Sequence, residues 1–478
     1  MNKYKSLAFN TLVFTIGSFG SKLISVFLNN LYTKHIDPAS LFTKSLLETL
    51  ALFLIPVFTF SLKEALIRYG LDKDYDKKEV FSTAAILSAG GLGVMLLLMP
   101  VLPHIPYFGR LGSYTVLLAI YVLTSSLRAH CSQFVRACEM VRLFSLDGIL
   151  TTLLLFLFNL VFIGQFEMGV RGFMISTILS DFCSSVFLFL TGRLHRYFSP
   201  KAWSGDLAMQ MLRFTVPLIP TTVMWTFTGF SDQLFIGGMK SEKVFLGEDA
   251  AGIYAAAAKI PNLISMLSTI FFQAWNMSAI TENESADRNG FYEKVYSAYE
   301  AFLFIGSAGL LLLVRPVSAI FINYSVYPEY ATAYLNSPLL IAAAVFTCLD
   351  LFLASIYTAT KHTRNAFYTI LIVFLVNILL NFCMIPALGI QGAALATLLS
   401  YMLCFWVRIF DARRYVPFRF FGVVHVANTV LLLGQCALTI CQPKHYILLE
   451  IPLVCGILLL NQRPFITLVR KILKRERT

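Results

Sequence analysis

The sequence contains little charge. Only 13% of its 478 residues are Asp, Glu, Lys or Arg, whereas 57% are hydrophobic. A water-soluble domain carries about a quarter charged residues, so this composition excludes a soluble globular protein. The sequence therefore predicts an integral membrane protein.

Patterns typical of metal and nucleotide sites are also missing. The nine cysteines are scattered, and none shows the paired spacing of metal ligands. The chain has no glycine-rich loop ending in Gly-Lys that would hold nucleotide phosphates, so direct ATP hydrolysis is not expected. We expect no metal and no cofactor. Any transport would draw on a proton or sodium gradient, the membrane potential or the substrate concentration.

Apolar runs near 20 residues long recur along the chain. About fourteen of them could cross a hydrocarbon core as helices. Their centres lie near Ile16, Leu54, Leu92, Tyr121, Leu154, Leu179, Val223, Ile264, Ser307, Val345, Phe374, Thr397, Leu431 and Pro452. None of the runs alternates polar and apolar residues like a barrel strand, so we expect an all-α membrane bundle.

The positive charges are distributed unevenly. Most of the 38 Lys and Arg residues lie at the chain ends and in alternate connections between the apolar runs. By the positive-inside rule, this distribution places both termini in the cytoplasm. The basic tail 463–478 would pair with anionic lipid headgroups, so the net charge of +12 requires no nucleic acid partner.

A short motif occurs twice. Gly169-Val170-Arg171-Gly172, followed by Thr177 and Ser180, matches Gly389-Ile390-Gln391-Gly392, followed by Thr397 and Ser400. Both copies begin a predicted helix at the outer surface, which predicts two parallel six-helix repeats. The expected domains are an N-terminal six-helix lobe, a C-terminal six-helix lobe, an additional helix pair and a basic cytoplasmic tail, at residues 1–200, 201–415, 416–462 and 463–478.

Ionisable residues inside apolar runs are costly and therefore mark candidate sites. Lys22 lies in the first run, Lys44 and Glu48 in the second, Asp232 in the seventh and Lys259 in the eighth. The spacing of Lys44 and Glu48 puts them on one helix face. In the duplicated scheme Lys44 and Lys259 could face each other across a central cavity, which would suit an anionic substrate. The alternative is structural pairing of Lys44 with Glu48 and of Lys259 with Asp232.

Three further carboxylates, Asp181, Asp350 and Glu450, lie in apolar runs without an evident basic partner. They could carry a coupling proton or form hydrogen bonds within a lobe. Trp225 and Trp275 could stack on sugar rings, although tryptophan also serves as a packing or interface anchor.

Three segments together resemble the Wzx-type bacterial polysaccharide flippases. They are Phe14 to Lys22, Phe230 to Ile236 with Tyr254 and Lys259 behind it, and Asn381 to Thr397. The resemblance spans nearly the whole chain. It implies the multidrug/oligosaccharidyl-lipid/polysaccharide exporter fold, and movement of a polyprenyl-diphosphate-linked oligosaccharide from the cytoplasmic to the outer leaflet of the bacterial cytoplasmic membrane.

This function would give the charged residues a role. We expect Lys22, Lys44 and Lys259 to bind the diphosphate and Trp225 to contact the sugars. Glu48 and Asp232 would act as charge partners or proton carriers. Membrane lipids, a glycan polymerase and glycosyltransferases are the expected partners.

Other functions remain open from the sequence. A multidrug or cation antiporter and a peptidoglycan-precursor flippase would have the same fold. From another class, a membrane glycan polymerase or ligase would also handle polyprenyl diphosphates. Such enzymes generally need a sizeable outer loop or an outward cluster of catalytic residues, and the sequence contains neither. We therefore expect a transporter and not an enzyme.

Overall fold

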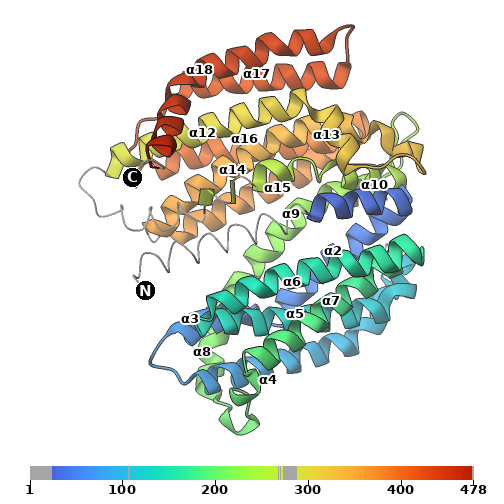
Figure 1. Ribbon diagram of the computed structural model, residues 1–478, viewed down its shortest axis with the longest axis vertical. Coiled ribbons are helices and arrows are strands. Elements are labelled where there is room, and N and C mark those ends of the chain that lie inside the picture. The colour runs from blue at the N-terminus through green and yellow to red at the C-terminus, as the bar shows by residue number, and fades with distance from the viewer. Residues whose placement is uncertain are drawn as a thin grey trace. The chain divides into compact units, whose positions relative to one another are not determined.

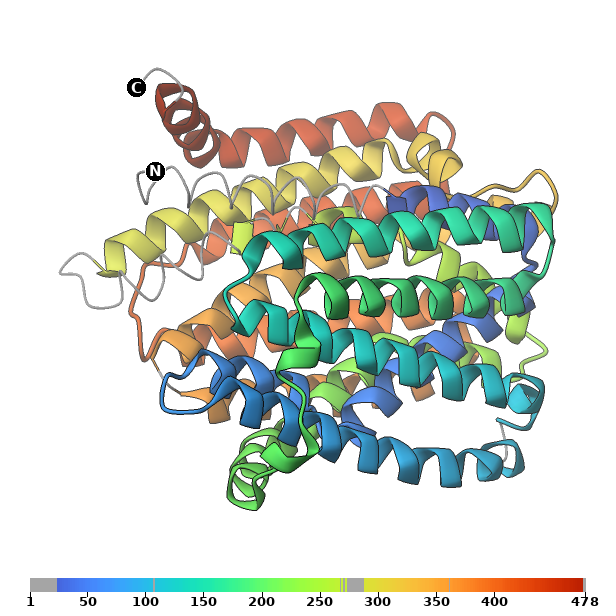
Figure 2. The ribbon, with the colours of Figure 1, turned by 60° about the horizontal axis from the view of Figure 1, so that its bottom comes forward.

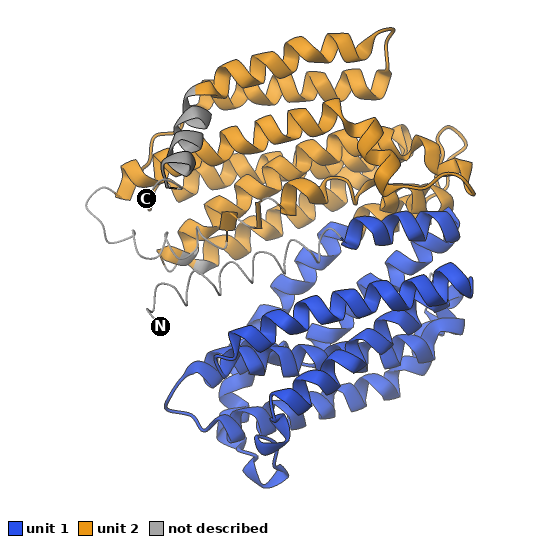
Figure 3. Ribbon diagram, in the orientation of Figure 1, with its two compact units in different colours: residues 1–230 blue, residues 231–478 orange. Residues whose placement is uncertain are grey.

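The computed structural model describes residues 24–105, 108–266, 268–269, 271–272, 288–360 and 362–475. Of residues 358, 363 and 463–475 it describes only the backbone. These ranges contain helices and turns and no strand, which confirms the all-α prediction. The chain divides into two compact units, residues 1–230 and 231–478, and each is described by itself (Figure 3).

Many of these helices have the length and apolarity of membrane spans. Within the described ranges, ten are long and apolar enough to cross a bilayer, and a shorter apolar helix covers Tyr446–Gln462. The chain is therefore a multi-pass membrane protein. The count of fourteen spans and the parallel orientation of the repeats stay predictions.

Unit 1 is built around helix α5. Its main helices are α2 (Pro38–Phe58), α3 (Leu62–Leu71), α4 (Lys77–Leu98), α5 (Thr115–Ala137), α6 (Val141–Asn159), α7 (Gly169–Thr191), α8 (Gly205–Thr215) and the first part of α9 (Ile219–Gly238). Helices α2, α3, α4, α6 and α7 all pack against α5, and α6 packs along α7 (Figures 1 and 2).

The second predicted span is broken into α2 and α3. Pro56 lies in the last turn of α2, and Phe60 and Ser61 adopt the left-handed conformation between the two helices. Gly91 of α4 packs directly onto this break, since a Cβ atom at Gly91 would lie 2.0 Å from the carbonyl oxygen of Phe58. Only glycine permits an approach this close.

Helix α8 packs on α3 and α4, so unit 1 continues past residue 200. Ser204 caps the helix by accepting a hydrogen bond from the backbone N–H of Leu207. Leu207 and Met211 are buried in the apolar cluster that α8 shares with α3 and α4. The Tyr69 hydroxyl of α3 donates to the backbone oxygen of Gln210 at 3.3 Å. The segment predicted to open the second lobe is thus held by the first unit.

Unit 2 is a second helical bundle. It contains the rest of α9 and helices α10 (Glu248–Ala257), α12 (Arg288–Leu312), α13 (Val314–Phe321), α14 (Ser337–Ala359), α15 (Thr363–Leu388), α16 (Ile390–Ala412), α17 (Gly422–Cys441) and α18 (Tyr446–Arg475). Helix α16 packs against α14 and α15. Helices α17 and α18 form a hairpin whose members both pack on α12 (Figures 1 and 2).

Polar side chains fasten this hairpin. Asn428 of α17 and Asn461 of α18 exchange two hydrogen bonds of 2.8 and 3.2 Å through their side-chain amides. Nδ1 of His425 on α17 lies 2.6 Å from the Glu300 carboxylate on α12. Polar contacts of this kind hold helices together where lipid offers little hydrophobic driving force.

The first glycine of the duplicated motif has a positive φ angle in both units. Gly169 and Gly389 have φ angles of 52° and 61°, a conformation that glycine adopts readily. Three residues later, a Cβ atom on Gly172 would lie 3.0 Å from the Phe162 carbonyl oxygen, and one on Gly392 would lie 2.4 Å from the Met384 carbonyl oxygen. In each copy the second glycine thus packs the motif helix closely on the segment before it. The connection takes residues 166–168 in the first copy and Gly389 alone in the second.

Candidate functional site

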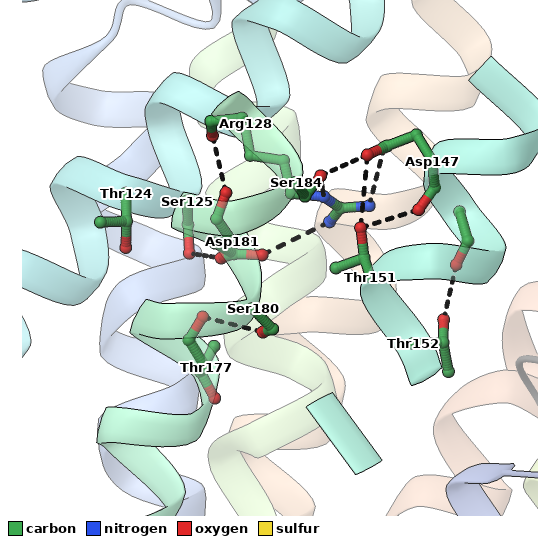
Figure 4. Close-up of polar contacts among 12 residues, drawn as sticks. Thr124, Ser125, Arg128, Asp147, Thr151, Thr152, Thr177, Ser180, Asp181 and Ser184 are labelled. Atoms are coloured by element: carbon green, nitrogen blue, oxygen red, sulfur yellow. Dashed lines mark hydrogen bonds and ion pairs between the residues drawn. The ribbon is translucent and has the colours of Figure 1, made fainter. Parts of the chain in front are cut away.

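An arginine of unit 1 lies between two carboxylates from neighbouring helices (Figure 4). Arg128 of α5 places Nη2 3.3 Å from Oδ2 of Asp147 on α6, and Nη1 3.6 Å from Oδ1 of Asp181 on α7. Its Nε donates to the Ser184 hydroxyl at 3.1 Å. The side chains of Asp147 and Asp181 are 1% and 9% exposed, and that of Arg128 is 30% exposed. We call these three charged residues the Arg128 cluster.

Hydroxyl groups complete the Arg128 cluster. Ser184 donates to Asp147, and Ser125 donates to Asp181. Thr151 also reaches Asp147, at 3.4 Å. Each of these hydroxyl residues lies three or four positions along its own helix from the charged residue of that helix. The polar faces of α5, α6 and α7 therefore meet at the cluster (Figure 4). The result is a polar site within an apolar bundle.

This arrangement corrects one expectation. Asp181 was expected to lack a basic partner, but Arg128 is that partner. Arg128 itself lies inside α5, which continues to Ala137. Asp147 went unnoticed because it lies near the beginning of its apolar run. The sequence held one signal of the cluster, because the spacing of Ser125 and Arg128 puts both polar residues on one face of a helix.

The predicted pair of Lys44 and Glu48 is formed in unit 1. The Lys44 ammonium lies 2.8 Å from Oε2 of Glu48, as their spacing on α2 predicted. It also lies 4.7 and 4.3 Å from the ring centroids of Tyr32 and Phe173. The Lys44 side chain is only 5% exposed, whereas that of Glu48 is 36% exposed. In this structure the lysine is enclosed, and its carboxylate partner is the accessible member of the pair.

A second buried carboxylate lies in unit 2. Asp232 of α9 accepts hydrogen bonds from Asn381 of α15 at 2.7 Å, from Thr397 of α16 at 2.6 Å, and from the Tyr254 hydroxyl of α10. Asp232, Asn381 and Tyr254 are buried. We call these four residues the Asp232 cluster. Each donor is neutral, so no basic side chain of the described residues balances the carboxylate.

Asn377 links the Asp232 cluster to the helices around it. Its Oδ1 accepts from Ser231 at 2.6 Å and from Asn381 at 3.1 Å, and its Nδ2 donates to Thr397 at 3.1 Å. Oδ1 of Asn381 is buried and has no hydrogen-bond partner among the described residues. The cluster thus has an unused oxygen next to a buried carboxylate.

Lys259 does not pair with Asp232. It lies directly after α10, where the chain leaves the helix before Pro261. The side chain is half-buried, and no acceptor for its ammonium lies among the described residues. The structural pairing that the sequence left open is therefore absent.

The two other intramembrane carboxylates have different surroundings. Arg408 lies beside Asp350 but donates to its backbone oxygen at 2.9 Å and to the Thr369 hydroxyl at 3.0 Å. Glu450 accepts a hydrogen bond from Thr439 at 2.7 Å. Arg408 lies inside α16 and is buried.

The remaining candidates are placed only in part. Lys22 and Trp275 lie outside the described residues. Trp225 lies on α9 in unit 1 and is 41% exposed. Because Lys44 belongs to unit 1 and Lys259 to unit 2, a common cavity between them stays a prediction. Within the described ranges, no group of three or more His, Cys, Asp or Glu could hold a metal ion.

Comparison with known proteins identifies the family. The family model for polysaccharide biosynthesis proteins matches residues 45–322, and the model for the Lipid II flippase MurJ matches residues 263–451. No curated protein matches the sequence. The matched families are transporters and flippases and not enzymes, as the sequence predicted.

Solved structures share the fold. The Lipid II flippase MurJ in an inward closed conformation is similar over 95% of this chain and 98% of its own, with 16% identity and a TM-score of 0.68. An inward-facing multidrug resistance MATE family transporter of the MOP superfamily has 16% identity and a TM-score of 0.62, over 84% of this chain and 94% of its own. A MATE transporter of Vibrio cholerae, VcmN, has 13% identity and a TM-score of 0.60, over 87% and 98%.

These structural similarities establish the fold alone, because the identities are low. The polysaccharide biosynthesis model covers more than half of the chain and confirms the resemblance found in the sequence. The protein belongs to the polysaccharide biosynthesis protein family and has the helical fold of the MOP superfamily.

Proposed function

We propose that this protein is a flippase that moves a polyprenyl-diphosphate-linked oligosaccharide from the cytoplasmic to the outer leaflet of the bacterial cytoplasmic membrane. Both termini would lie in the cytoplasm. The observation that carries the proposal is the match to the polysaccharide biosynthesis family over residues 45–322. Alternating access of two lobes would give the oligosaccharide a path across the membrane for capsule, O-antigen or exopolysaccharide synthesis.

Physical chemistry supports such a role for the lysines. A diphosphate with attached sugars cannot cross hydrocarbon unaided, and a compact ammonium group is suited to follow a moving phosphate. Lys259 is half-buried at a helix break and has an ammonium without an acceptor among the described residues. Lys44 would first have to exchange Glu48 for the phosphate. We therefore assign the first contact in unit 2 to Lys259, and assign Lys44 to a later step.

The Asp232 cluster is suited to bind a coupling cation. A buried carboxylate without a basic partner is costly in a membrane, and a bound proton or sodium ion would remove that cost. The oxygens of Asp232, Tyr254 and Thr397 already converge. Because the oxygen and nitrogen of an asparagine amide are assigned from its hydrogen bonds, rotating Asn381 would aim its unused oxygen at the same point. We propose that this cluster couples transport to an ion gradient.

The leaflet that holds the lipid-linked glycan tests the function. In a strain depleted of the protein, sealed vesicles of both orientations would be probed from outside with a glycan-specific lectin. We expect the glycan on the cytoplasmic leaflet, and its return to the outer leaflet when the wild-type gene is restored. Normal outward display after depletion would overturn the proposal.

A peptidoglycan-precursor flippase is a second candidate. The MurJ family model matches residues 263–451, which include α12 to α17 and only the first residues of α18. Under this alternative, depletion would leave the peptidoglycan precursor on the cytoplasmic leaflet and would stop growth by lysis. The same vesicles, probed for both glycans, separate the two functions.

A further inference from the structure

The Arg128 cluster has more negative than positive charge. It contains one guanidinium, on Arg128, and two carboxylates, on Asp147 and Asp181. With both carboxylates ionised, the cluster would carry a net charge of −1. An unbalanced charge in the apolar layer of a membrane is costly, and the cost falls when one carboxylate takes up a proton.

The hydrogen bonds show which carboxylate is the better proton acceptor. Each oxygen of Asp147 has a donor, because Ser184 donates to Oδ1 and Arg128 donates to Oδ2, while Thr151 donates mainly to the Asp147 backbone oxygen at 2.8 Å. For Asp181, Ser125 donates to Oδ2, but Oδ1 has only the 3.6 Å ion pair with Arg128. This distance is too long for a hydrogen bond. Oδ1 of Asp181 is therefore the oxygen where a proton would replace the weakest existing contact.

The cluster is open on one side. The Arg128 side chain is 30% exposed, and Asp181 is the more exposed of the two carboxylates. Intramembrane charges of this kind normally face the bundle interior or a water-filled cavity. The hydroxyls of Thr177 and Ser180 lie along α7 below Asp181 (Figure 4). Both hydroxyls donate to backbone oxygens of α7 itself, so Arg128 is the accessible member of the cluster.

Neighbouring helices supply further titratable groups. On α5, Tyr121 lies near Asp181 and Cys131 lies near Asp147. Beyond Tyr121, α2 contributes Glu48, which is paired with Lys44.

The polar and charged groups that α3 and α4 contribute lie near a histidine of α5. His130 of α5 binds Ser88 of α4 at 2.7 Å, with Lys63 of α3 nearby. The charges that bear directly on Asp181 are therefore Arg128 and Asp147.

We propose that the Arg128 cluster is a proton-binding site, at which Asp147 and Asp181 hold one proton between them and Oδ1 of Asp181 carries it. A hydronium ion transfers the proton to this oxygen and leaves as water. Asp147 keeps its ion pair with Arg128. Unit 1 then has its own ionisable site, in addition to the Asp232 cluster of unit 2. This inference goes beyond the proposed function, because it requires neither a glycan nor a cation at Asp232.

Infrared spectroscopy of the purified full-length protein in lipid nanodiscs tests the proposal. A protonated aspartate has a carboxylic C=O band that the ionised form lacks. We expect Asp181→Asn to remove one such band at neutral pH. Asp147→Asn should remove the same band although Asp181 is still present, because Asp181 then faces Arg128 alone and ionises. A band that stays unchanged in either folded variant would overturn the proposal.

Hydroxyl variants keep the three charges and so protect the test against misfolding. Ser125→Ala removes the hydroxyl that donates to Asp181, so the acid band should persist to higher pH than in the wild type. Ser185→Ala is the matched control, because this hydroxyl bonds only the backbone oxygen of Asp181 and should leave the titration unchanged. An identical titration for Ser125→Ala and the wild type would contradict the site.

The unit 2 carboxylate serves as a further control. Asp232→Asn should leave the Asp181 band in place. Since none of these spectra requires transport, a negative result here leaves the flippase proposal standing. The leaflet assay can fail, in turn, while the proton band is present.

Discussion

The hydroxyl of Thr397 donates a 2.6 Å hydrogen bond to the carboxylate of Asp232, which joins α16 to α9 within unit 2. Thr397 belongs to the second copy of the duplicated motif. Its counterpart in the first copy, Thr177, donates instead to the backbone oxygen of Phe173, one turn earlier in its own helix. The threonine at this position of the motif therefore donates to a buried carboxylate in unit 2, and only to the backbone of its own helix in unit 1.

This difference provides a matched pair of substitutions. Thr397→Val should strengthen proton binding at Asp232 about tenfold or more, because the ionised carboxylate loses a hydrogen bond, and such a bond to a charged group contributes roughly 1.5–3 kcal/mol. Asp232→Asn should abolish the dependence of transport on a proton or sodium gradient. Transport in proteoliposomes, with each gradient imposed in turn, measures both effects. Thr177→Val is the control, and an equal effect of the two threonine substitutions would argue against a cation site.

Lys259 should be required for transport and not for folding. Lys259→Gln removes an ammonium that has no acceptor among the described residues, so we expect normal protein abundance and loss of outer-leaflet glycan. Lys22→Ala should have the same effect if Lys22 contacts the diphosphate. The leaflet assay measures the transport, and immunoblotting measures the abundance. Lys243→Gln changes an exposed outer lysine and should be silent; full transport by Lys259→Gln would remove this residue from the site.

The tight helix contact at Gly392 should tolerate no side chain. Gly392→Ala would place a Cβ atom 2.4 Å from the Met384 carbonyl oxygen and force α15 and α16 apart. We expect a loss of about 1–3 kcal/mol in stability, seen as a lower melting temperature in detergent. At Gly309 of α12 an added Cβ meets nothing within 4 Å, so Gly309→Ala should be neutral or stabilising. Equal melting temperatures for the two variants would show that α15 and α16 can move apart at this contact without loss of stability.

The pair of His425 and Glu300 should stabilise the C-terminal hairpin. Both side chains are buried, and His425→Ala would leave the Glu300 carboxylate without this partner. We expect a loss of about 1–3 kcal/mol, because an unsatisfied buried polar group costs that much. Thermal unfolding in detergent measures it, with His195→Ala at an exposed position as the control. An unchanged melting temperature in His425→Ala would mean that packing alone holds α17 on α12.

Much of the fold could be predicted from the sequence, because membrane helices follow from composition and length. The duplicated glycines and the Lys44–Glu48 pair were also predictable, since both depend on spacing along one or two helices. The Arg128 cluster was missed because its residues lie on three helices. The sequence does not show how each helix is rotated about its axis, and so does not show which side chains face one another. The donors to Asp232 were missed for a related reason. They are neutral residues of α10, α15 and α16, and a search for charges cannot find them.

The two copies of the motif share their glycines and differ beside them. The position after the shared serine is Asp181 in the first copy and Tyr401 in the second. Asp181 of the Arg128 cluster therefore lies on the motif helix of unit 1, while the acid of the Asp232 cluster lies on α9. A chain made from two copies of either half would keep the motif glycines and lose one of the two clusters.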